Sequence, residues 1–409
     1  YTVAPVRSES RSEMCNGEVM TQSAIRLAAS SMSDTVGGFV VFCPSTSTPP
    51  LCMKTTRLPV ASANRTGRVV RMRSITAPQP GGPDALKLSD SPVPSAQPGE
   101  VVVKVGAAGV NRADVLQRMG FYTPPKGATD ILGLEAAGTV YQVGDGVDDW
   151  QVGDRVAVLL TGGGYAEYVP VPAGQVLPVP EGMSFVEAAA LPEVVATVYS
   201  NVVMAAGLSE GEWLLVHGGA SGIGTMAIQI AKQMGARVAV TVGSDDRARK
   251  CADLGADAVI NYRDEDFVER IREITGSGEG ADGSAGARVP GADVILDIIG
   301  AKYLERNIQA LSADGRLIII GMQGGTNAQI NLGVLLPLRR SVMGTTLRAR
   351  PAEQKAHIVA EVRKHVWPAV ASGKIRPIVD RVFALDDCVQ AHEHMDQPHF
   401  GKIVLEVNP

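Results

Sequence analysis

The chain has 409 residues, of which 45% are hydrophobic, and a formal net charge of −5 at pH 7. This length allows two domains or one large one with a substantial core, and the charge gives no sign of a nucleic-acid or membrane-surface binder. No unbroken apolar run approaches 18 residues, so no transmembrane helix is predicted. The five cysteines form no CxxC pair, which fits a reducing compartment and offers no zinc-ribbon spacing.

Residues 1–68 are rich in Ser, Thr and Pro and show no sustained hydrophobic period. Positions 35–83 contain no Asp or Glu while arginines accumulate, a composition typical of an organelle transit segment. Acidic residues before position 35 fit that interpretation poorly, and a disordered tail or a mistranslated upstream region is the alternative. We expect a cytoplasmic protein, or a plastid or mitochondrial one if this extension is a transit peptide.

From position 70 the sequence becomes rich in valine. The segments "GEVVVKVGAAGVN" (99–111) and "DRVAVLL" (154–160) have the composition of strands, with Gly, Pro and Asp between them. We therefore predict a β-rich domain over about 70–190.

After position 191, short apolar strands alternate with helices. This alternation predicts a parallel sheet covered on both faces. Strands are predicted at 213–217, 237–242, 257–260, 292–299, 316–321 and 339–347, and helices at 222–234, 245–254, 264–274 and 301–311. The glycine-rich stretch 276–291 is longer than a connection needs and is predicted to be a flexible surface insertion. A helix over 352–372 and the strand "GKIVLEV" (401–407) return to the first domain.

The segment "HGGASGIGTMAIQIAK" (217–232) joins a predicted strand to a predicted helix. Unpaired N–H groups at a helix N-terminus can hold pyrophosphate oxygens, and glycine lets the ligand approach. The flanking alternation favours a nucleotide site over a simple tight turn. The predicted contacts are Gly219, Ser221, Gly222, Ile223 and Gly224.

The residues at the end of the second strand of the alternating region indicate which cofactor binds. An NAD-selective site carries a carboxylate about 20 residues after the glycine-rich turn, and this chain has Gly243 and Ser244 there. A 2′-phosphate would meet no fixed negative charge there, Ser244 could donate to it, and Lys232 could supply a positive charge. We therefore expect NADPH rather than NADH. Asp245 and Asp246 follow directly, and we interpret Asp245 as a helix cap rather than a ribose ligand.

Together with "VNRADVLQRMGFYTPPKGATDILGLEAAGTV" (110–140) and "LPEVVATVYSNV" (191–202), these segments resemble the medium-chain dehydrogenase/reductases. The resemblance is greatest to the zinc-independent NADPH:quinone oxidoreductase branch, in its tumour-suppressor-inducible quinone oxidoreductase-like group, and covers 70–409. It implies an α/β fold, with a GroES-like β-rich catalytic domain over 69–192 and 346–409. A Rossmann domain with a doubly wound parallel sheet would occupy 193–345, and the protein would be a homodimer that pairs through the edge strand 339–347.

The zinc-containing relatives hold their catalytic metal with a Cys, a His and a Cys, and the matching positions here are Asn111, Leu134 and Glu193. Leucine cannot bind a metal, and two oxygen ligands make a poor zinc site. We therefore expect no metal. The C-terminal histidines are expected to be surface residues: His357, His365, His392, His394 and His399.

Reduction of a quinone or enone suits a site without zinc, because the acceptor is already electron-poor and the cofactor carries the hydride. A polar group near the acceptor oxygen would stabilise the developing charge. The candidates are Asn111, Asp114 and Tyr122, and the resemblance implies that the asparagine and the tyrosine lie by the substrate cleft. The alternatives are that Asn111 forms a turn, that Asp114 caps a helix and that Tyr122 packs in the core.

The resemblance also implies several cofactor contacts outside the glycine turn. Tyr262 would lie near the adenosine, and Gly321 and Met322 near the nicotinamide. Three more candidates are Leu347, Arg348 and Lys402, with a surface charge as the alternative for Arg348. His399 and Phe400 stand where relatives often have Asn, which puts a contact there in doubt.

The favoured function is NADPH-dependent reduction of quinones without a metal. The nearest alternative is a 2-alkenal, enone or enoyl-thioester reductase, which needs the same hydride geometry. A non-catalytic NADPH-binding protein that binds RNA is an alternative of another class, although the basic residues are dispersed. A zinc alcohol dehydrogenase is a third option.

Overall fold

The computed structural model describes residues 70–276 and 289–407. The N-terminal extension 1–68 and most of the predicted insertion 276–291 lie outside the described residues. Within them the chain forms a six-stranded parallel sheet, a seven-stranded sheet and a β-hairpin-like pair, β1 (Arg71–Thr76) with β2 (Lys87–Pro92). The predicted α/β class, with a doubly wound parallel sheet and a β-rich part, is confirmed.

The parallel sheet has the strand order β10-β9-β8-β11-β12-β13. Its strands are β8 (Trp213–His217), β9 (Arg237–Val242), β10 (Ala258–Asn261), β11 (Ala292–Asp297), β12 (Leu311–Ile319) and β13 (Ser341–Gly344). Its helices are α4 (Gly222–Gln233), α5 (Asp245–Asp253), α6 (Phe267–Gly276), η4 (Ala301–Tyr303) and α7 (Leu304–Ala310), with η5 (Leu332–Val334) before β13. The predicted elements are all present; β12 begins five residues earlier than expected, because it pairs with β11 from Leu311 onward.

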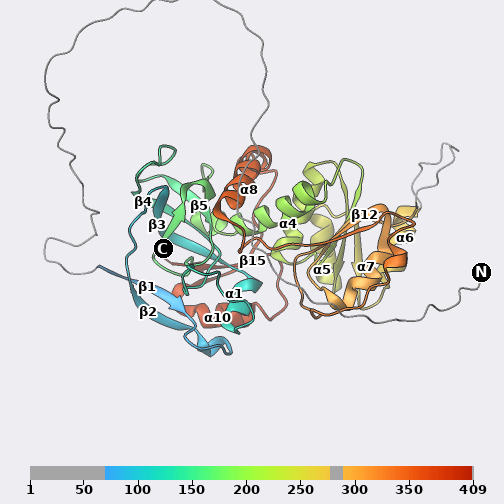
Figure 1. Cartoon of the computed structure of the whole chain (residues 1–409), viewed down its shortest axis with the longest axis horizontal. Helices are drawn as coiled ribbons and strands as arrows, with labels where there is room; N and C mark the ends of the chain where they lie inside the picture. Colours follow the sequence, from blue (N-terminus) through green and yellow to red (C-terminus); the bar gives the residue numbers. More distant parts are fainter. Residues whose placement is uncertain (1–69, 277–288, 408–409) are drawn as a thin grey trace, which may run out of the picture. The chain divides into compact units, whose positions relative to one another are not determined.

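The second sheet has the order β14-β15-β3-β4-β5-β7, with β6 also paired to β3. Its strands are β3 (Glu100–Val110), β4 (Glu135–Val143), β5 (Arg155–Leu159), β6 (Tyr168–Pro172), β7 (Val176–Pro178), β14 (Val379–Ala384) and β15 (Lys402–Glu406). The C-terminal strand β15 pairs antiparallel with β3, Ile403 opposite Val110, so the chain returns to its first sheet as predicted (Figure 1).

Several helices accompany this sheet. They are η1 (Pro83–Ala85), α1 (Arg112–Arg118), η2 (Ala173–Gln175), α2 (Phe185–Ala188), α8 (Ala352–His365), α9 (Trp367–Ala371), η6 (Leu385–Asp387) and α10 (Cys388–His394). The helix predicted over 352–372 is two helices, because Pro368 lacks the N–H that a continuous helix needs and occupies the first turn of α9.

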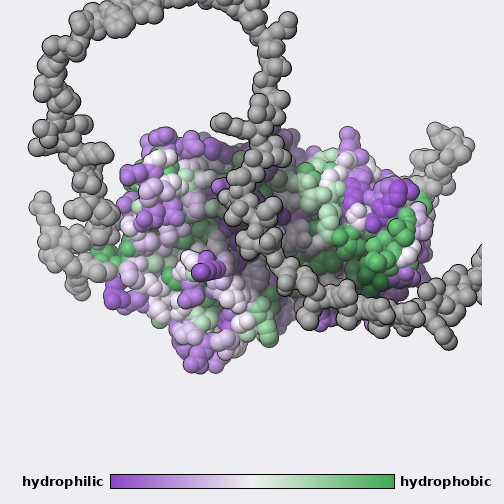
Figure 2. Space-filling view, in the orientation of Figure 1, coloured by the Kyte–Doolittle hydropathy of each residue, from purple (hydrophilic) through white to green (hydrophobic). Residues whose placement is uncertain are grey.

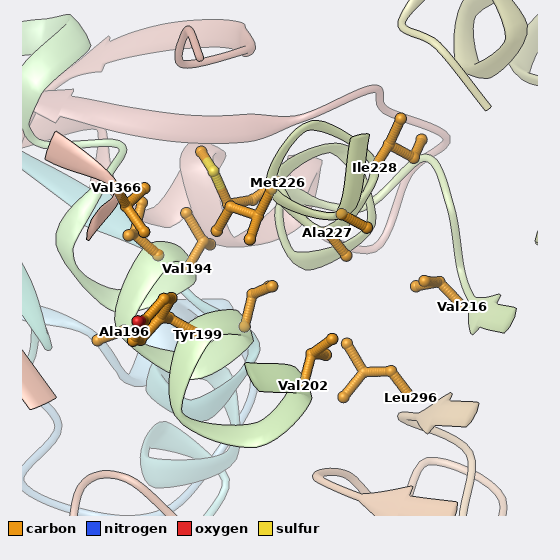
Figure 3. Close-up of a cluster of buried hydrophobic side chains, with 14 of the residues drawn as sticks. Val194, Ala196, Tyr199, Val202, Val216, Met226, Ala227, Ile228, Leu296 and Val366 are labelled. Carbon is orange, nitrogen blue, oxygen red and sulfur yellow. The ribbon is translucent and has the colours of Figure 1, made fainter. Parts of the chain in front are cut away.

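A helical segment links the two sheets. Helix α3 (Pro192–Val198) continues as the π-helix η3 (Tyr199–Ala205), and its apolar face packs against α4, with Val194 near Met226 (Figure 3). By length and composition alone the stretch Phe185–Ala205 could cross a membrane. However, 78% of its most apolar window is buried inside the protein, so packing accounts for its apolar character.

The parallel strands end at one edge of their sheet, and this edge positions the site. Every residue of β8 is buried, as expected for a central strand covered by helices on both faces. Ligands of such sheets bind outside the carboxyl ends of the strands. The turns after β8, β9, β11 and β12 therefore define the region in which to look for a binding site.

Candidate functional site

The glycine turn lies between β8 and α4. Gly218 has a φ of 78°, and a side chain at Gly219 would come within 2.6 Å of Val240 on β9. Ser221 caps α4, because its Oγ accepts the N–H of Gly224 at 3.0 Å. The first N–H groups of the helix thus face the turn, ready for an anion. The structure brings together the predicted residues Gly219, Ser221, Gly222, Ile223 and Gly224 at this place.

A second group of predicted cofactor contacts lies after β9. The hydroxyl of Tyr262 lies against Gly243, so a side chain at 243 would overlap it, and the tyrosine is 46% exposed. Ser244 caps α5 and its Oγ accepts from Nε of Arg247 at 3.1 Å. The predicted group of Gly243, Ser244 and Tyr262 is therefore contiguous. Arg247 was not predicted, although a cation three residues past the ribose position was a readable signal.

The two aspartates after Ser244 are engaged elsewhere. Asp245 Oδ1 accepts from the Asn261 amide at 3.1 Å, and Asp246 pairs with Lys250 at 2.9 Å. The interpretation of Asp245 as the helix cap was wrong, because Ser244 is the N-cap and Asp245 is the first helical residue. A half-buried guanidinium, that of Arg247, is instead the cation beside Ser244.

The contact predicted for Lys232 is wrong. This residue is ten positions along α4 from Gly222, about 15 Å at the rise of an α-helix. Its ammonium forms an ion pair with Asp257 at 2.8 Å, at the far end of the helix. It can supply no charge to a ligand at the carboxyl ends of β8 and β9.

The loop after β12 lies at the same sheet edge as the glycine turn. Gly321 packs so closely on Ile298 that a side chain there would come within 2.8 Å of its carbonyl oxygen, and Met322 is exposed. Asp297 anchors this edge by accepting the N–H groups of Ile299 at 2.7 Å and Gly300 at 2.9 Å. Burial raises the pKa of Asp297 to about 6. A contact of Gly321 and Met322 with a nicotinamide stays a prediction.

A buried polar group lies beside the glycine turn, where β3, β4 and β15 meet. Asn111 follows β3 and begins α1; its Nδ2 donates to Glu135 Oε1 at 2.9 Å and its Oδ1 accepts from Lys402 at 2.6 Å. Lys402 and Glu135 form an ion pair at 2.6 Å and are almost fully buried. Glu135 was not predicted, because nothing in the local sequence of β4 marks a partner that lies on the last strand of the chain.

The ammonium of Lys402, predicted to contact the cofactor, is directed away from the glycine turn. Its ammonium is directed at Asn111, Glu135 and the Val110 carbonyl oxygen, the last at 3.1 Å. Only its aliphatic stem touches the turn: a side chain at Gly222 would come within 2.5 Å of Lys402 Cδ. The N–H of Gly401 donates to the Ala220 carbonyl oxygen at 2.8 Å, which ties β15 to the turn.

Glu193 lies next to this polar group. Its backbone N–H donates to Glu135 Oε2 at 2.9 Å, and its own Oε2 is buried with no hydrogen-bond partner among the described residues. Burial and then the neighbouring Glu135 carboxylate raise the pKa of Glu193 to about 8. The side chain is therefore mostly protonated at neutral pH.

Asp114 is a helix-capping residue. It has no exposed surface, and its carboxylate accepts from the N–H groups of Asn111 and Gly133 and from the Tyr165 hydroxyl, at 2.8 to 3.2 Å. The capping interpretation is confirmed. Its candidacy for a place beside the acceptor was wrong, because burial leaves it no access to a ligand. Burial also raises the pKa of Asp114 to about 6.

His392 is buried, contrary to the expectation of a surface histidine. Its Nε2 lies 3.3 Å from the Tyr165 hydroxyl and its Nδ1 lies 3.4 Å from Arg118. Burial, with the positive charge of Arg118, lowers the pKa of His392 to about 3, so the ring is neutral. The sequence could not show that α10 packs this face against the second sheet.

Tyr122 and Arg348 lie at the loops of the second sheet. The Tyr122 hydroxyl is 3.1 Å from Thr346 Oγ1, and its side chain is partly exposed. The guanidinium of Arg348 lies 5.3 Å above the Tyr122 ring and donates to the Thr161 carbonyl oxygen and to Gln117. Arg348 is thus buried rather than a surface charge, and Leu347 is a core residue. The structure does not support the cofactor contacts predicted for these two residues.

The positions that match zinc ligands in relatives carry a different donor set. Leu134 is a buried hydrocarbon, while Asn111 and Glu193 flank the ion-paired Glu135. Within residues 70–276 and 289–407, no three His, Cys, Asp or Glu side chains are placed to hold a metal ion. The side chains at this place form a hydrogen-bonded group among themselves.

Two family models match the chain: the alcohol dehydrogenase GroES-like domain over residues 97–181 and the zinc-binding dehydrogenase over residues 222–362. Quinone oxidoreductase of Rattus norvegicus is 31% identical over 338 residues, 82% of this chain and 97% of that protein. A component of the phenolphthiocerol/phthiocerol polyketide synthase of Mycobacterium tuberculosis is 32% identical over 336 residues, 80% of this chain but 14% of that much longer protein. A solved structure of Escherichia coli quinone oxidoreductase complexed with NADPH has a TM-score of 0.70 and 30% identity, covering 82% of this chain and 99% of that one.

Proposed function

The chain belongs to the medium-chain dehydrogenase/reductase superfamily, and on this premise we propose that it catalyses the NADPH-dependent reduction of quinones. The observation that carries the proposal is the position of Lys402, which touches both Gly222 of the turn and Asn111. A hydride donor bound at the turn and an acceptor oxygen near Asn111 would therefore be neighbours.

The residues at the edge of the parallel sheet fit NADPH. The cradle from Gly218 to Gly224 has room only because its glycines lack side chains, and it presents the start of α4 to a pyrophosphate. Arg247, beside Ser244, offers the cation that a 2′-phosphate needs, while the carboxylates of Asp245 and Asp246 are paired with other groups. Tyr262 presents an exposed ring at the same place. The E. coli relative in complex with NADPH supports this choice of cofactor.

When bound, NADPH supplies the hydride. The chain contributes placement and a hydrogen bond. Asn111 is partly exposed, and an N–H of its amide can donate to the acceptor oxygen, where negative charge develops. Tyr122 lies at a neighbouring loop, with its hydroxyl held by Thr346. The last proton comes from water, and none of the described residues is required to act as a metal ligand.

A 2-alkenal, enone or enoyl-thioester reductase is the second candidate. The 32% identity to a segment of a polyketide synthase component supports this candidate. Quinones and enones accept hydride in the same way, so the same amide would serve either oxygen.

We also propose a homodimer. Within the described residues β13 is an edge strand with β12 as its neighbour, and an unpaired edge is a template for pairing with a second copy. Large apolar side chains are exposed on the segment before it: Met322, Ile330, Leu332, Val334 and Leu336. Figure 2 shows hydrophobic surface on this side, where Figure 1 labels α7 and β12. Contiguous exposed apolar surface of this kind indicates an interface.

Turnover of 9,10-phenanthrenequinone against that of a simple enone and of crotonyl-CoA, each with NADPH, tests the proposed function. We expect the quinone to give the highest kcat/KM. A higher kcat/KM with the enone or the thioester would favour the second candidate. Tight NADPH binding without turnover of any acceptor would indicate a binding protein.

A further inference from the structure

Three side chains close a ring of hydrogen bonds beside the glycine turn. Lys402 Nζ lies 2.6 Å from Asn111 Oδ1 and 2.6 Å from Glu135 Oε1, and the same Glu135 oxygen accepts from Asn111 Nδ2 at 2.9 Å. An ammonium can only donate, and a carboxylate can only accept. The ring therefore fixes which end of the Asn111 amide is the oxygen and which is the nitrogen.

The ring is held rigidly by its surroundings. The third donor of Lys402 goes to the Val110 carbonyl oxygen at 3.1 Å, and the other Glu135 oxygen accepts the N–H of Glu193 at 2.9 Å. Glu135 has no exposed surface and Lys402 is 5% exposed. A buried ion pair is well defined only when its remaining lone pairs and protons are satisfied, as they are here.

One hydrogen of the Asn111 amide is left over. The hydrogen donated to Glu135 is the one on the same side of the amide as Oδ1. Lys402 contacts both Oδ1 and the carboxylate oxygen that accepts this hydrogen, so the two atoms lie close together. The other acceptor near Nδ2 is the Gly109 carbonyl oxygen, and the 3.5 Å between these two atoms is beyond the length of a good hydrogen bond. Asn111 is partly exposed, so an entering oxygen atom can replace this long contact.

We propose that Lys402 and Glu135 are positioning residues, which hold this N–H of Asn111 toward the oxygen of the acceptor. The inference rests on the proposed function and deepens it. A donor that is oriented before the reaction needs no reorganisation as charge develops on the acceptor. An asparagine without the pair would rotate or flip and present its carbonyl oxygen to that charge for part of the time.

A paired substitution separates orientation from charge burial. In the full chain, Glu135→Gln together with Lys402→Met leaves no unpaired buried charge. It does remove the two charged groups that fix which end of the Asn111 amide is the oxygen and which is the nitrogen. With saturating NADPH and 9,10-phenanthrenequinone, we expect kcat to fall by about 10- to 100-fold. The Kd for NADPH, measured by fluorescence titration without acceptor, should change by less than about threefold, because the pair does not face the pyrophosphate.

The same pair change in an Asn111→Ala background completes the test. With no amide left to orient, the double substitution should lower kcat by less than about twofold further. An equal loss of kcat in both backgrounds would overturn the proposal, because the pair would then act independently of Asn111. An unchanged kcat in the Asn111 background would overturn it as well.

Controls keep the result interpretable. Glu212→Gln with Arg316→Met removes a partly buried ion pair of 2.8 Å near the start of β8, away from the site, and should leave kcat within about twofold. Should the Glu135/Lys402 variant not fold, Lys402→Arg is compared with Lys402→Met; the arginine retains donors and should keep at least about fivefold more activity, and equal activities would contradict the proposal. If the wild type reduces enones but not quinones, the proposed function fails, and the same cycle run with the enone still tests the pair.

Discussion

The stem of Lys402 occupies the space beside the α-carbon of Gly222, so that a methyl group at position 222 would lie 2.5 Å from Lys402 Cδ. The lysine stem therefore leaves no space for a side chain at position 222, and the lack of a side chain at Gly222 leaves space for the stem. Gly222 begins the helix that faces the pyrophosphate site, and Lys402 begins the strand that returns to the second sheet.

Gly222→Ala should weaken cofactor binding. The added methyl group must displace the lysine stem or the turn, and overpacking of this kind costs about 1–3 kcal/mol. We expect the Kd for NADPH to rise by about tenfold in a fluorescence titration. Gly344→Ala is the matched control, because a methyl group at Gly344 would meet nothing within 4 Å. An unchanged Kd in Gly222→Ala would show that the turn has more room than the structure indicates.

Arg247→Gln should reduce the preference for NADPH. The guanidinium beside Ser244 is the cation expected to face a 2′-phosphate, whereas NADH has no group for it to bind. The kcat/KM with NADPH should fall by about 10- to 100-fold, while that with NADH changes little. Arg249→Gln, whose guanidinium is exposed and contacts Asp246, is the control and should leave the ratio unchanged. An equal fall in kcat/KM with NADPH and with NADH would show that Arg247 does not bind the 2′-phosphate.

Glu193→Gln should change how stability depends on pH. The folded pKa of Glu193 is about 8, raised from 4.5, so the folded protein holds a proton that the unfolded chain releases between these values. The stability from this group is complete below pH 4.5 and is lost as the pH rises through 8, by up to about 1.4 kcal/mol per pH unit. The variant lacks this loss, so its unfolding free energy relative to wild type should increase between pH 5 and pH 8.

Urea unfolding at pH 5, 6.5 and 8, at one protein concentration, measures this trend. Glu187→Gln is the control. Hydrogen bonds from Ser184 lower the pKa of Glu187, so its protonation affects stability only below pH 4.5. The difference in unfolding free energy between this variant and wild type should therefore be constant from pH 5 to 8. A flat difference for Glu193→Gln would show that this carboxyl is ionised in the folded protein.

Leu336→Glu should separate the two protomers of the proposed dimer. Leu336 is 77% exposed in the segment before β13, and a carboxylate there could not be buried against a second copy without a large desolvation cost. Sedimentation of the purified protein should show a shift from dimer to monomer. Leu88→Glu introduces the same charge at an exposed position of β2 and should leave the dimer intact. A wild-type monomer would contradict the homodimer directly.

Much of the fold could be predicted because its signals are local. Strand–helix alternation, the glycine turn after β8 and the absence of a carboxylate at Gly243 are all readable within short windows of sequence. The error at Lys232 was avoidable, since the rise of a helix places a residue ten positions along it far from the turn.

The polar group around Asn111 could not be predicted in the same way. Its members are Asn111, just after β3, Glu135 of β4 and Lys402 of β15, and Lys402 follows Asn111 by 291 positions. Only the pairing of β15 with β3 brings the two together. For the same reason the burial of His392 and Arg348 depends on which elements pack over them, and no periodicity in their own segments reveals it.

The most direct test of NADPH-dependent reduction is the ratio of kcat/KM for NADPH to that for NADH, measured on the full chain with 9,10-phenanthrenequinone as acceptor. The arrangement of Gly243, Ser244 and Arg247 predicts a ratio of about ten or more in favour of NADPH. A ratio at or below one would contradict it, because the cation beside Ser244 would then have no phosphate to bind.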